Sequence, residues 1–328
     1  MQERVLDWLV CPVSKTRLTL TVTHREGDEI MQGELVGETG LRYPIRAGVP
    51  RMIAGQNSTE VDDTVGNFGW QWQTFHELLP PEVEREQFLE WVAPLSDADF
   101  VGQVVLDAGC GMGRWSEAAA GLGAREVFAV DLGAGVEPAF RRLRSYENVH
   151  VIQADIMALP FRTGSGAPFD LAYSLGVIHH MPDPKAGFQS YLSHVRSGGT
   201  VLAWVYGAEN NGWIIHGVNP IRRHITSRLS PPVLHALSRV LSVPLHGAAK
   251  VVHRRGVRDR FAYGPYLDWL GQFSFLHTHV IVHDHLTPGI ASYHTREEVE
   301  SWAVESRLSD ARVVSRNNNS WRLLGKVS

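Results

Sequence analysis

The chain has 328 residues, of which 44% are hydrophobic and 20% charged, with a formal net charge of −4. This composition is that of a globular protein with a full core and excludes a largely disordered chain. So small a net charge favours neither nucleic acid nor an anionic membrane as a partner of the whole molecule. The only two cysteines, Cys11 and Cys110, lie far apart in the sequence, which disfavours a disulfide framework. With no basic-then-apolar leader and no 18-residue apolar run, we expect a cytoplasmic protein without a transmembrane segment.

Residues 1–55 are predicted to form a small β-rich module. Residues 17–22 alternate between polar and apolar side chains, and Gly-containing turns separate them from two further short runs at 33–36 and 41–45. Residues 56–100 begin as a polar linker and continue as an aromatic-rich stretch at 68–72. A helix is predicted after it, because apolar residues recur at three- and four-residue spacing between 82 and 92.

A glycine-rich turn follows the apolar run 104–108. Gly109, Gly111 and Gly113 stand at every second position, directly before a helix-forming segment at 114–120. A strand that is followed by a glycine turn without side chains and then by a helix N-terminus is typical of a nucleotide-binding site. The third glycine of a dinucleotide fingerprint is replaced by Arg114, which disfavours an oxidoreductase. A second apolar strand, 127–130, ends in Asp131, whose carboxylate can accept hydrogen bonds from both ribose hydroxyls of a nucleoside.

Strand and helix patterns alternate from residue 101 onward. Further strands are predicted at 149–154, 169–174 and 200–206, and helices over 136–143 and from Pro184 to a stop at 197–199. This alternation predicts a doubly wound α/β domain at 101–328, with a mostly parallel sheet and helices on both faces. At the end of the chain, Thr295 and Glu298 form a capping-box pattern before a helix, and residues 311–315 and 321–326 read as a hairpin.

The segments VLDAGCGMGR and VFAVDL resemble motifs I and II of the class I S-adenosylmethionine (SAM) dependent methyltransferases. The resemblance continues through QADIMALPF, FDLAYSLGVIHHMPDP and LSHVRSGGTVLAWVYG, and covers residues 60–210 and 290–328. It implies a Rossmann-like sheet of seven strands whose last strand is antiparallel. It also implies SAM as the cofactor, released as S-adenosylhomocysteine, and a lid formed by residues 56–100.

The same resemblance implies which residues hold the cofactor. Asp155 would accept a hydrogen bond from the adenine amino group, and Ile156 would pack on the ring; a turn-forming role is the alternative for Asp155. One aromatic residue of the 68–72 stretch is expected to face the cofactor or the acceptor. The full set of expected cofactor contacts is Asp107, Gly109, Cys110, Gly111, Gly113, Asp131, Leu132, Asp155, Ile156 and Leu175.

The N-terminal module resembles the small zinc-ribbon domain of activator subunits of tRNA and release-factor methyltransferases, through CPVSKTRL and GETGLRYPIRAGVPRMI. Of the four zinc-binding cysteines of that family only Cys11 is present, with Ser14, Val36 and Thr39 in the other positions. A single thiolate cannot complete a tetrahedral site, so we expect a module without metal. It is either a docking module or a structural cap.

Residues 207–265 form a basic insertion, with nine Lys or Arg residues and two acids. Val233, Leu234, Leu237, Val240 and Leu241 predict an amphipathic helix in it. As a lid on the ligand side of the sheet, the insertion would admit an anionic acceptor through Arg222 and Arg223, or rest on a membrane surface. A merely solvated basic face is the alternative.

Histidines are the candidate bases for the reaction. His179 and His180 follow the fourth strand, where ligands of open α/β sheets bind, and His294 and Tyr293 are predicted to reach the acceptor pocket. Backbone hydrogen bonding within the turn is the alternative for the histidine pair. The N/D-P-P-Y loop of nucleic-acid amino methyltransferases is missing after this strand, so we expect a small-molecule acceptor and no nucleic acid.

The histidines of FLHTHVIVHDH, at 277–285, are mostly two residues apart and predict a row on one strand face. A metal site completed by Asp284 or His294 is the less favoured hypothesis, and no metal is expected. The sequence therefore predicts a methyltransferase that acts on a small molecule, with O-methylation favoured over N- or C-methylation. The alternative is a catalytically idle scaffold of the same fold that binds a partner.

Overall fold

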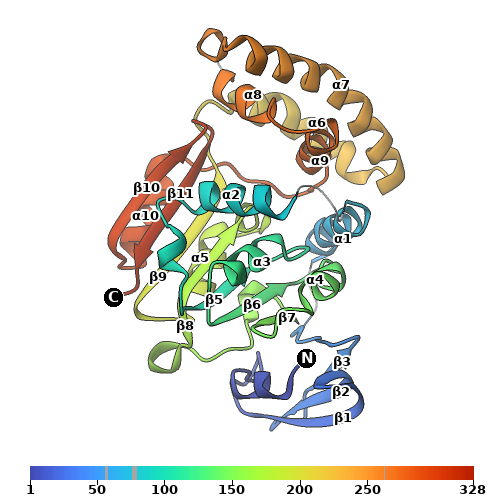
Figure 1. The fold of residues 1–328 in the computed structure, drawn as a ribbon, viewed down its shortest axis with the longest axis vertical. Coiled ribbons are helices and arrows are strands. Elements are labelled where there is room, and N and C mark those ends of the chain that lie inside the picture. The colour runs from blue at the N-terminus through green and yellow to red at the C-terminus, as the bar shows by residue number, and fades with distance from the viewer. Residues whose placement is uncertain (56–57, 76–79, 262) are drawn as a thin grey trace.

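The computed structural model describes residues 1–55, 58–75, 80–261 and 263–328. Residues 56–57 and 76–79 of the expected linker and lid, and residue 262 of the insertion, lie outside the described part. Two β-sheets organise the chain (Figure 1). The small one is antiparallel in the order β1-β2-β3-β4, with β1 at Leu18–Glu26, β2 at Glu29–Gly37, β3 at Arg42–Arg46 and β4 at Val49–Pro50.

The large sheet has seven strands in the order β10-β11-β9-β8-β5-β6-β7. Strand β11 is antiparallel to both of its neighbours, whereas β9, β8, β5, β6 and β7 are parallel, so the predicted fold class is confirmed. The strands are β5 (Val104–Ala108), β6 (Glu126–Asp131), β7 (Val149–Gln153), β8 (Phe169–Leu175), β9 (Val195–Tyr206), β10 (Ser309–Arg316) and β11 (Ser320–Lys326). The helices are α1 (Thr59–Thr74), α2 (Pro81–Val92), α3 (Arg114–Gly121), α4 (Val136–Leu143), α5 (Pro184–Leu192), α6 (Asn219–His224), α7 (Pro231–Arg255), α8 (Gly264–Leu270), α9 (Phe275–Leu286) and α10 (Arg296–Glu305).

Helices cover both faces of the large sheet, which explains why β5 is buried along its whole length. Leu106 belongs to a core that includes Phe188 of α5 and Trp302 of α10. Val105 points to the opposite core, with Phe88 of α2 and residues of α3 and α4. The carboxyl ends of the parallel strands are thereby left free for a site.

The N-terminal module shares a hydrophobic core with the large sheet. Leu9 and Ile30 belong to the same buried cluster as Phe128, and the rings of Trp8 and Phe128 lie 5.1 Å apart. Main-chain hydrogen bonds also join the two parts, from Val10 to Pro160 and from Met52 to Gln153. The module is therefore packed as part of the molecule's core.

Truncating Leu9 to alanine is expected to destabilise the whole protein by about 2–5 kcal/mol, because this buried side chain belongs to the shared core. Chemical denaturation followed by tryptophan fluorescence measures the change. Val13→Ala is the control: this side chain is 60% exposed, and the expected change stays below about 0.5 kcal/mol. Two separate transitions, with only one shifted by Leu9→Ala, would contradict a shared core.

Two boundaries differ from the sequence-based prediction. Helix α5 ends at Leu192, and β9 already begins at Val195, so Val195 is a strand residue and not part of the helix. Gly199 lies inside this strand, where an added Cβ would approach the Val195 side chain to 2.6 Å. The glycines therefore permit a tight strand irregularity instead of ending a helix. The aromatic-rich stretch, in turn, is itself helical, within α1.

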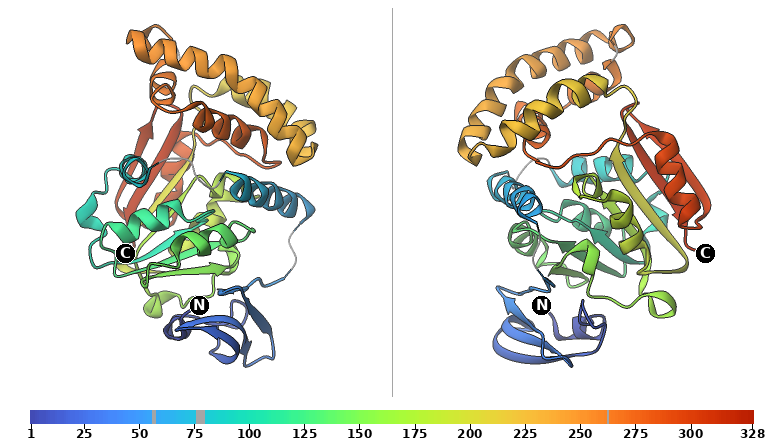
Figure 2. Two further views of the ribbon diagram at one scale, coloured as in Figure 1. Left: turned by 45° about the vertical axis from the view of Figure 1, so that its right-hand side comes forward. Right: turned by 180° about the vertical axis from the view of Figure 1, so that it is seen from behind.

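The chain end agrees with the prediction. Thr295 and Glu298 form the capping box of α10, and β10 and β11 form the hairpin, with Asn317 and Asn318 in the left-handed conformation at its turn. The insertion and the residues that follow it, up to Leu286, form a helical layer, α6 to α9, beyond the end of the large sheet that is opposite the N-terminal module (Figures 1 and 2). Within the described residues, no helix is long and apolar enough to cross a membrane.

Candidate active site

The glycine turn adopts a conformation that larger residues would not tolerate. Gly109, Gly111 and Gly113 have φ of +92°, +53° and +83°. A Cβ on Gly109 would lie 2.4 Å from the Val177 side chain, and a Cβ on Gly111 would lie 3.0 Å from Trp72 Nε1. Gly109, Cys110 and Gly111 line a large cavity, whereas Gly113 is the N-cap of α3. The turn thus leaves bare backbone beside a space for a ligand.

Asp131 holds this turn in place. Its two carboxylate oxygens accept hydrogen bonds from the backbone N–H groups of Gly111, at 2.9 Å, and Gly133, at 2.7 Å. Burial raises the pKa of the carboxyl above its ordinary value, while the two N–H donors oppose that rise. Because Asp131 also lines the cavity and each oxygen has a further lone pair, it can accept ribose hydroxyls as well.

Asp107 lies beneath the turn, outside the cavity lining. It is 1% exposed and accepts a hydrogen bond of 2.6 Å from Ser116 Oγ of α3. Burial raises its pKa to about 7. The structure therefore places Asp107 where it ties β5 to the start of α3.

Four of the other expected cofactor residues line the cavity: Leu132, Asp155, Ile156 and Leu175. Asp155 also caps the short turn that follows it, because its Oδ1 accepts from the Met157 N–H at 2.8 Å. One oxygen of this carboxylate is thus used locally. Above the glycine turn lies α1, from which Phe68 and Trp72 also line the cavity.

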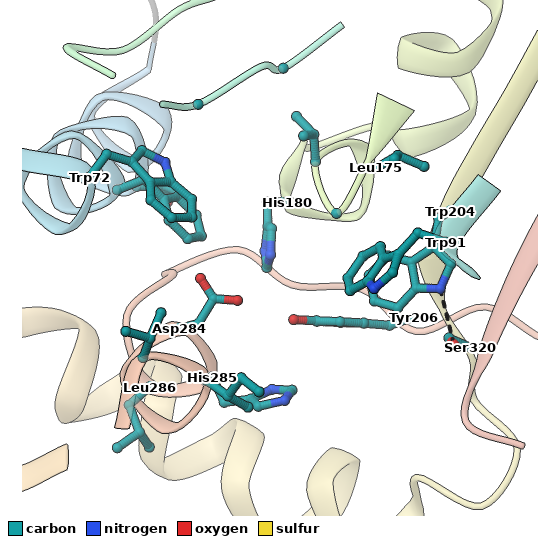
Figure 3. A pocket seen from close by; sticks show the side chains of 18 of the residues that line it. Trp72, Trp91, Leu175, His180, Trp204, Tyr206, Asp284, His285, Leu286 and Ser320 are labelled. Carbon is teal, nitrogen blue, oxygen red and sulfur yellow. Dashed lines mark hydrogen bonds between the residues drawn. The ribbon is translucent and has the colours of Figure 1, made fainter. Parts of the chain in front are cut away.

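The cavity has a volume of about 990 Å3 and extends from the glycine turn to the helical layer. This is at the upper end of the range for ligand sites, and the wall is mostly apolar and aromatic. Trp91 and Trp204, with ring centroids 4.4 Å apart, and Tyr206 form one side of it (Figure 3). Trp204 is fixed by a hydrogen bond of 3.2 Å from its Nε1 to Ser320 Oγ.

Three polar groups point into the middle of this apolar space. Figure 3 shows the Asp284 carboxylate, the His180 ring and the Tyr206 hydroxyl converging on it. Asp284 comes from α9, and its Oδ1 accepts a hydrogen bond of 3.0 Å from Gln71 Nε2 of α1. Burial raises the pKa of Asp284 to about 6. Sequence reasoning assigned no catalytic role to Asp284, because no local pattern links α9 to the glycine turn.

The tautomer of His180 follows from its hydrogen bond. Nδ1 lies 2.8 Å from the Ile290 carbonyl oxygen, and a carbonyl only accepts, so Nδ1 carries the proton. The remaining ring nitrogen, Nε2, is then an unprotonated acceptor. Burial lowers the pKa of His180 to about 3, helped by the positive charge of Arg222. The ring is therefore neutral at physiological pH and accepts a hydrogen bond more readily than it accepts a proton.

The other two histidines predicted for catalysis lie outside the cavity lining. His179 is fully buried, its ring centroid is 3.9 Å from that of Tyr206, and within the described residues neither ring nitrogen has a hydrogen-bond partner. His294 shares a hydrogen bond of 2.9 Å with Ser292 Oγ. Tyr293, by contrast, lines the cavity.

The histidine-rich segment 277–285 is the helix α9 and not a strand, so the predicted row on one strand face is wrong. Ser274 caps this helix by accepting from the His277 N–H at 3.3 Å. Because the segment is helical, its histidines point in different directions. His277 and His285 line the cavity. His279 contacts Ser238 of α7, and His283 contacts Gln71 of α1. Across the described part of the chain, no group of three or more His, Cys, Asp or Glu residues is placed to hold a metal ion.

Arg222 and Arg223 of the basic insertion have different surroundings. Arg223 is exposed, whereas Arg222 is 2% exposed and donates hydrogen bonds to Asn219 Oδ1 and, at 3.3 Å, to the His285 carbonyl oxygen. Its Nε has no hydrogen-bond partner among the described residues. The guanidinium lowers the pKa of Asp284 and of His180, so its positive charge acts on the polar centre of the cavity.

The strand order, the glycine turn and the acid that ends β6 are those of a class I SAM-dependent methyltransferase. Residues 105–199 match the family described as "Methyltransferase domain", and residues 2–48 match the family described as "Trm112p-like protein". The chain thus carries a SAM-dependent methyltransferase domain behind a Trm112p-like segment, and both sequence resemblances are confirmed.

The chain is also similar to individual proteins. It is 30% identical over 139 residues to the tRNA (carboxymethyluridine(34)-5-O)-methyltransferase of Arabidopsis thaliana, covering 41% of this chain and 32% of that protein. It is 33% identical over 137 residues to the ubiquinone biosynthesis O-methyltransferase of Paraburkholderia phymatum, covering 42% and 53%. A SAM-dependent methyltransferase structure from Mesorhizobium loti is 26% identical over 35% of this chain and 50% of that chain, with a TM-score of 0.31. The chain therefore spans only about a third to half of the curated relatives' length.

Proposed function

We propose that this protein transfers the methyl group of SAM to a hydroxyl group of a largely apolar small molecule. The observation that carries the proposal is the cavity, in which the glycine turn and Asp131 are continuous with an aromatic chamber that contains Asp284. The relatives named as O-methyltransferases are consistent with this choice of acceptor atom.

The proposed cofactor fits the residues present. Gly109 and Gly111 have positive φ, and a Cβ on either would collide with a side chain of the cavity wall, so the turn needs glycine to lie beside the cavity. In this proposal Asp131 accepts the ribose hydroxyls, Asp155 and Ile156 contact the adenine, and Leu132 and Leu175 pack on the nucleoside. Bound SAM supplies a methyl group on a positively charged sulfur and leaves as a neutral thioether.

The protein's own contribution is alignment and removal of one proton. Trp204 and Tyr206 hold the acceptor against the polar centre, an orientation effect that can lower the barrier by roughly 7–11 kcal/mol. Asp284 would accept the hydrogen bond of the acceptor hydroxyl and take its proton as the oxygen bonds to the methyl carbon and the bond from that carbon to sulfur breaks. The neutral His180 would help to orient the acceptor, with its Nε2 free to accept a hydrogen bond from a second donor group. A base with a pKa of about 6 is ionised at neutral pH and suited to this step.

Arg222 acts in this proposal as a positioning residue through its charge. Arg222→Met removes a buried cation that lowers the pKa of Asp284, so we expect the acidic limb of the pH–rate profile to move up by about one pH unit. We also expect a higher acceptor KM. Arg223→Met is the control, because this neighbouring side chain is exposed, and it should leave the profile in place. A purely structural role of Arg222 would lower the yield of folded enzyme without moving the limb.

The acceptor class is tested with radiolabelled SAM. The protein is incubated with organic extracts of cells and, separately, with total tRNA, and transfer is counted in each. We expect label in organic-soluble products that survive treatment with ribonuclease. Label in tRNA alone would contradict a small-molecule acceptor and would indicate tRNA, the acceptor in the name of the Arabidopsis relative. SAM binding without transfer to either pool would favour the idle scaffold.

A further inference from the structure

The outward face of α7 is apolar along most of its length. Val233, Val240, Val243 and Val251 are 52%, 68%, 61% and 49% exposed, and their spacing places them on one side of the helix. Between residues 233 and 251 the only charged side chains are Arg239 and Lys250. Lys250 reaches inward, where its Nζ donates to the Gly271 carbonyl oxygen at 2.8 Å.

The inward face of the same helix is partly polar. Ser238 and Ser242 are fully buried, and Ser238 Oγ forms a hydrogen bond of 2.9 Å with His279 Nε2 of α9. Leu234, Ala249 and Val252 are also buried on the inward face, so the departure from the usual pattern is the row of valines on the outward face. Such an exposed apolar face marks a surface that another apolar phase covers. Figure 2 shows α7 on the outside of the helical layer in both views.

Positive charge flanks this apolar face. Arg254 and Arg255 are exposed in its last turn, and Arg258 and Arg260 are exposed just beyond it, accompanied by the single acid Asp259. This basic rim at the carboxyl end of the apolar face complements an anionic lipid surface. A second copy of this chain packed in parallel against the same face would instead bring two equally basic rims together.

The cavity opens beside this face. Leu241 of α7 and Trp213, which precedes α6, line the cavity and are also 45% and 58% exposed. An apolar molecule leaving a bilayer that covers α7 would thus meet an apolar entrance. The apolar face of α7 and the apolar cavity are therefore both suited to a lipophilic acceptor.

We propose that the outward face of α7, with its basic rim, binds the surface of an anionic membrane, from which a lipophilic acceptor enters the cavity between Trp213 and Leu241. The entry route rests on the proposed function, whereas membrane binding itself does not. The valines insert below the headgroups, and the arginines contact the phosphates.

Vesicle co-sedimentation tests the binding. The full chain is mixed with vesicles of phosphatidylcholine and phosphatidylglycerol, or of phosphatidylcholine alone. We expect binding to the anionic vesicles that weakens at high salt, because screening reduces the contribution of the arginines. In the double variant Val240→Asp with Val243→Asp, we expect binding to fall about 100-fold, because two apolar contacts are lost and two anions are gained.

The matched control is Val304→Asp on α10, whose valine is 77% exposed and lies on a different layer of the molecule. It should bind vesicles as the unmodified protein does. SAM affinity, measured on each variant, separates this proposal from the proposed function, since α7 substitutions should leave it unchanged. The proposal is overturned if the folded, SAM-binding protein does not sediment with anionic vesicles. It is also overturned if Val240→Asp with Val243→Asp abolishes a dimer while vesicle binding is unchanged.

Discussion

Replacing Asp284 by asparagine is expected to lower kcat by about 100- to 10,000-fold, the usual contribution of a general base. Asparagine keeps the side-chain shape and can still accept the Gln71 hydrogen bond, so the fold should persist. The measurement is steady-state transfer to the identified acceptor at saturating SAM. Asp259→Asn is the control, because that side chain is 91% exposed and lies in the same helical layer of the molecule. Full activity of Asp284→Asn would show that another group is the general base.

The pH dependence of the reaction tests the same residue without relying on a single rate. The pKa of Asp284 is raised to about 6, and the base acts when it is ionised. We therefore expect kcat/KM to rise as the pH increases through about 6 and to level off above it. The pKa of His180, about 3, is too low to produce this limb. The residual activity of Asp284→Asn should lack it.

Replacing Asp131 by alanine is expected to weaken SAM binding by about 100-fold or more. Two buried backbone N–H groups, those of Gly111 and Gly133, would lose their acceptor at a cost of about 1–3 kcal/mol each, and the ribose would lose its partner. Asp131→Asn keeps one acceptor oxygen and should bind with intermediate affinity. Glu147→Ala, an exposed acid of the same domain, is the control. Unchanged affinity in Asp131→Ala would place the nucleoside elsewhere.

The cofactor half of the site could be predicted because its signals are local. The run 104–113 contains a strand, three glycines with positive φ and a helix start within ten residues, and the Asn-rich hairpin at the end of the chain is equally self-contained. Each of these features depends on backbone conformation that neighbouring residues determine. The alternation of strands and helices along the chain then predicted the mostly parallel large sheet.

The acceptor half could not be predicted, because it depends on contacts between distant segments. Residues 277–285 alternate like a strand, and their β-branched run 280–282 reinforces that pattern. They are nevertheless helical, and the helix contacts α7, Gln71 of α1 and Trp269 of α8 on different sides. The Ser274 N-cap was the available local signal. Asp284 meets His180 and Gln71 only in the folded chain.

Helix α7 shows the same limit in another form. Its apolar residues correctly predict a helix, but Val233, Val240 and Leu241 face solvent while Ser238 and Ser242 are buried. Hydrophobic periodicity identifies an apolar face, and only packing identifies what that face contacts. The sequence likewise left open whether the N-terminal module is a docking module or a structural cap. In the structure Leu9 lies in the core shared with Phe128, and the partly buried Trp8 packs against that core.

Titration of the purified protein with SAM in a calorimeter tests the central claim most directly, since every proposed step takes place beside the glycine turn. We predict binding of one SAM per chain with a dissociation constant between about 1 µM and 1 mM, the range of ordinary enzyme substrates. This binding should weaken strongly in Asp131→Ala and stay unchanged in Asp284→Asn. A folded protein that releases no heat with SAM at any temperature tested, and shows no thermal stabilisation by it, would contradict the account.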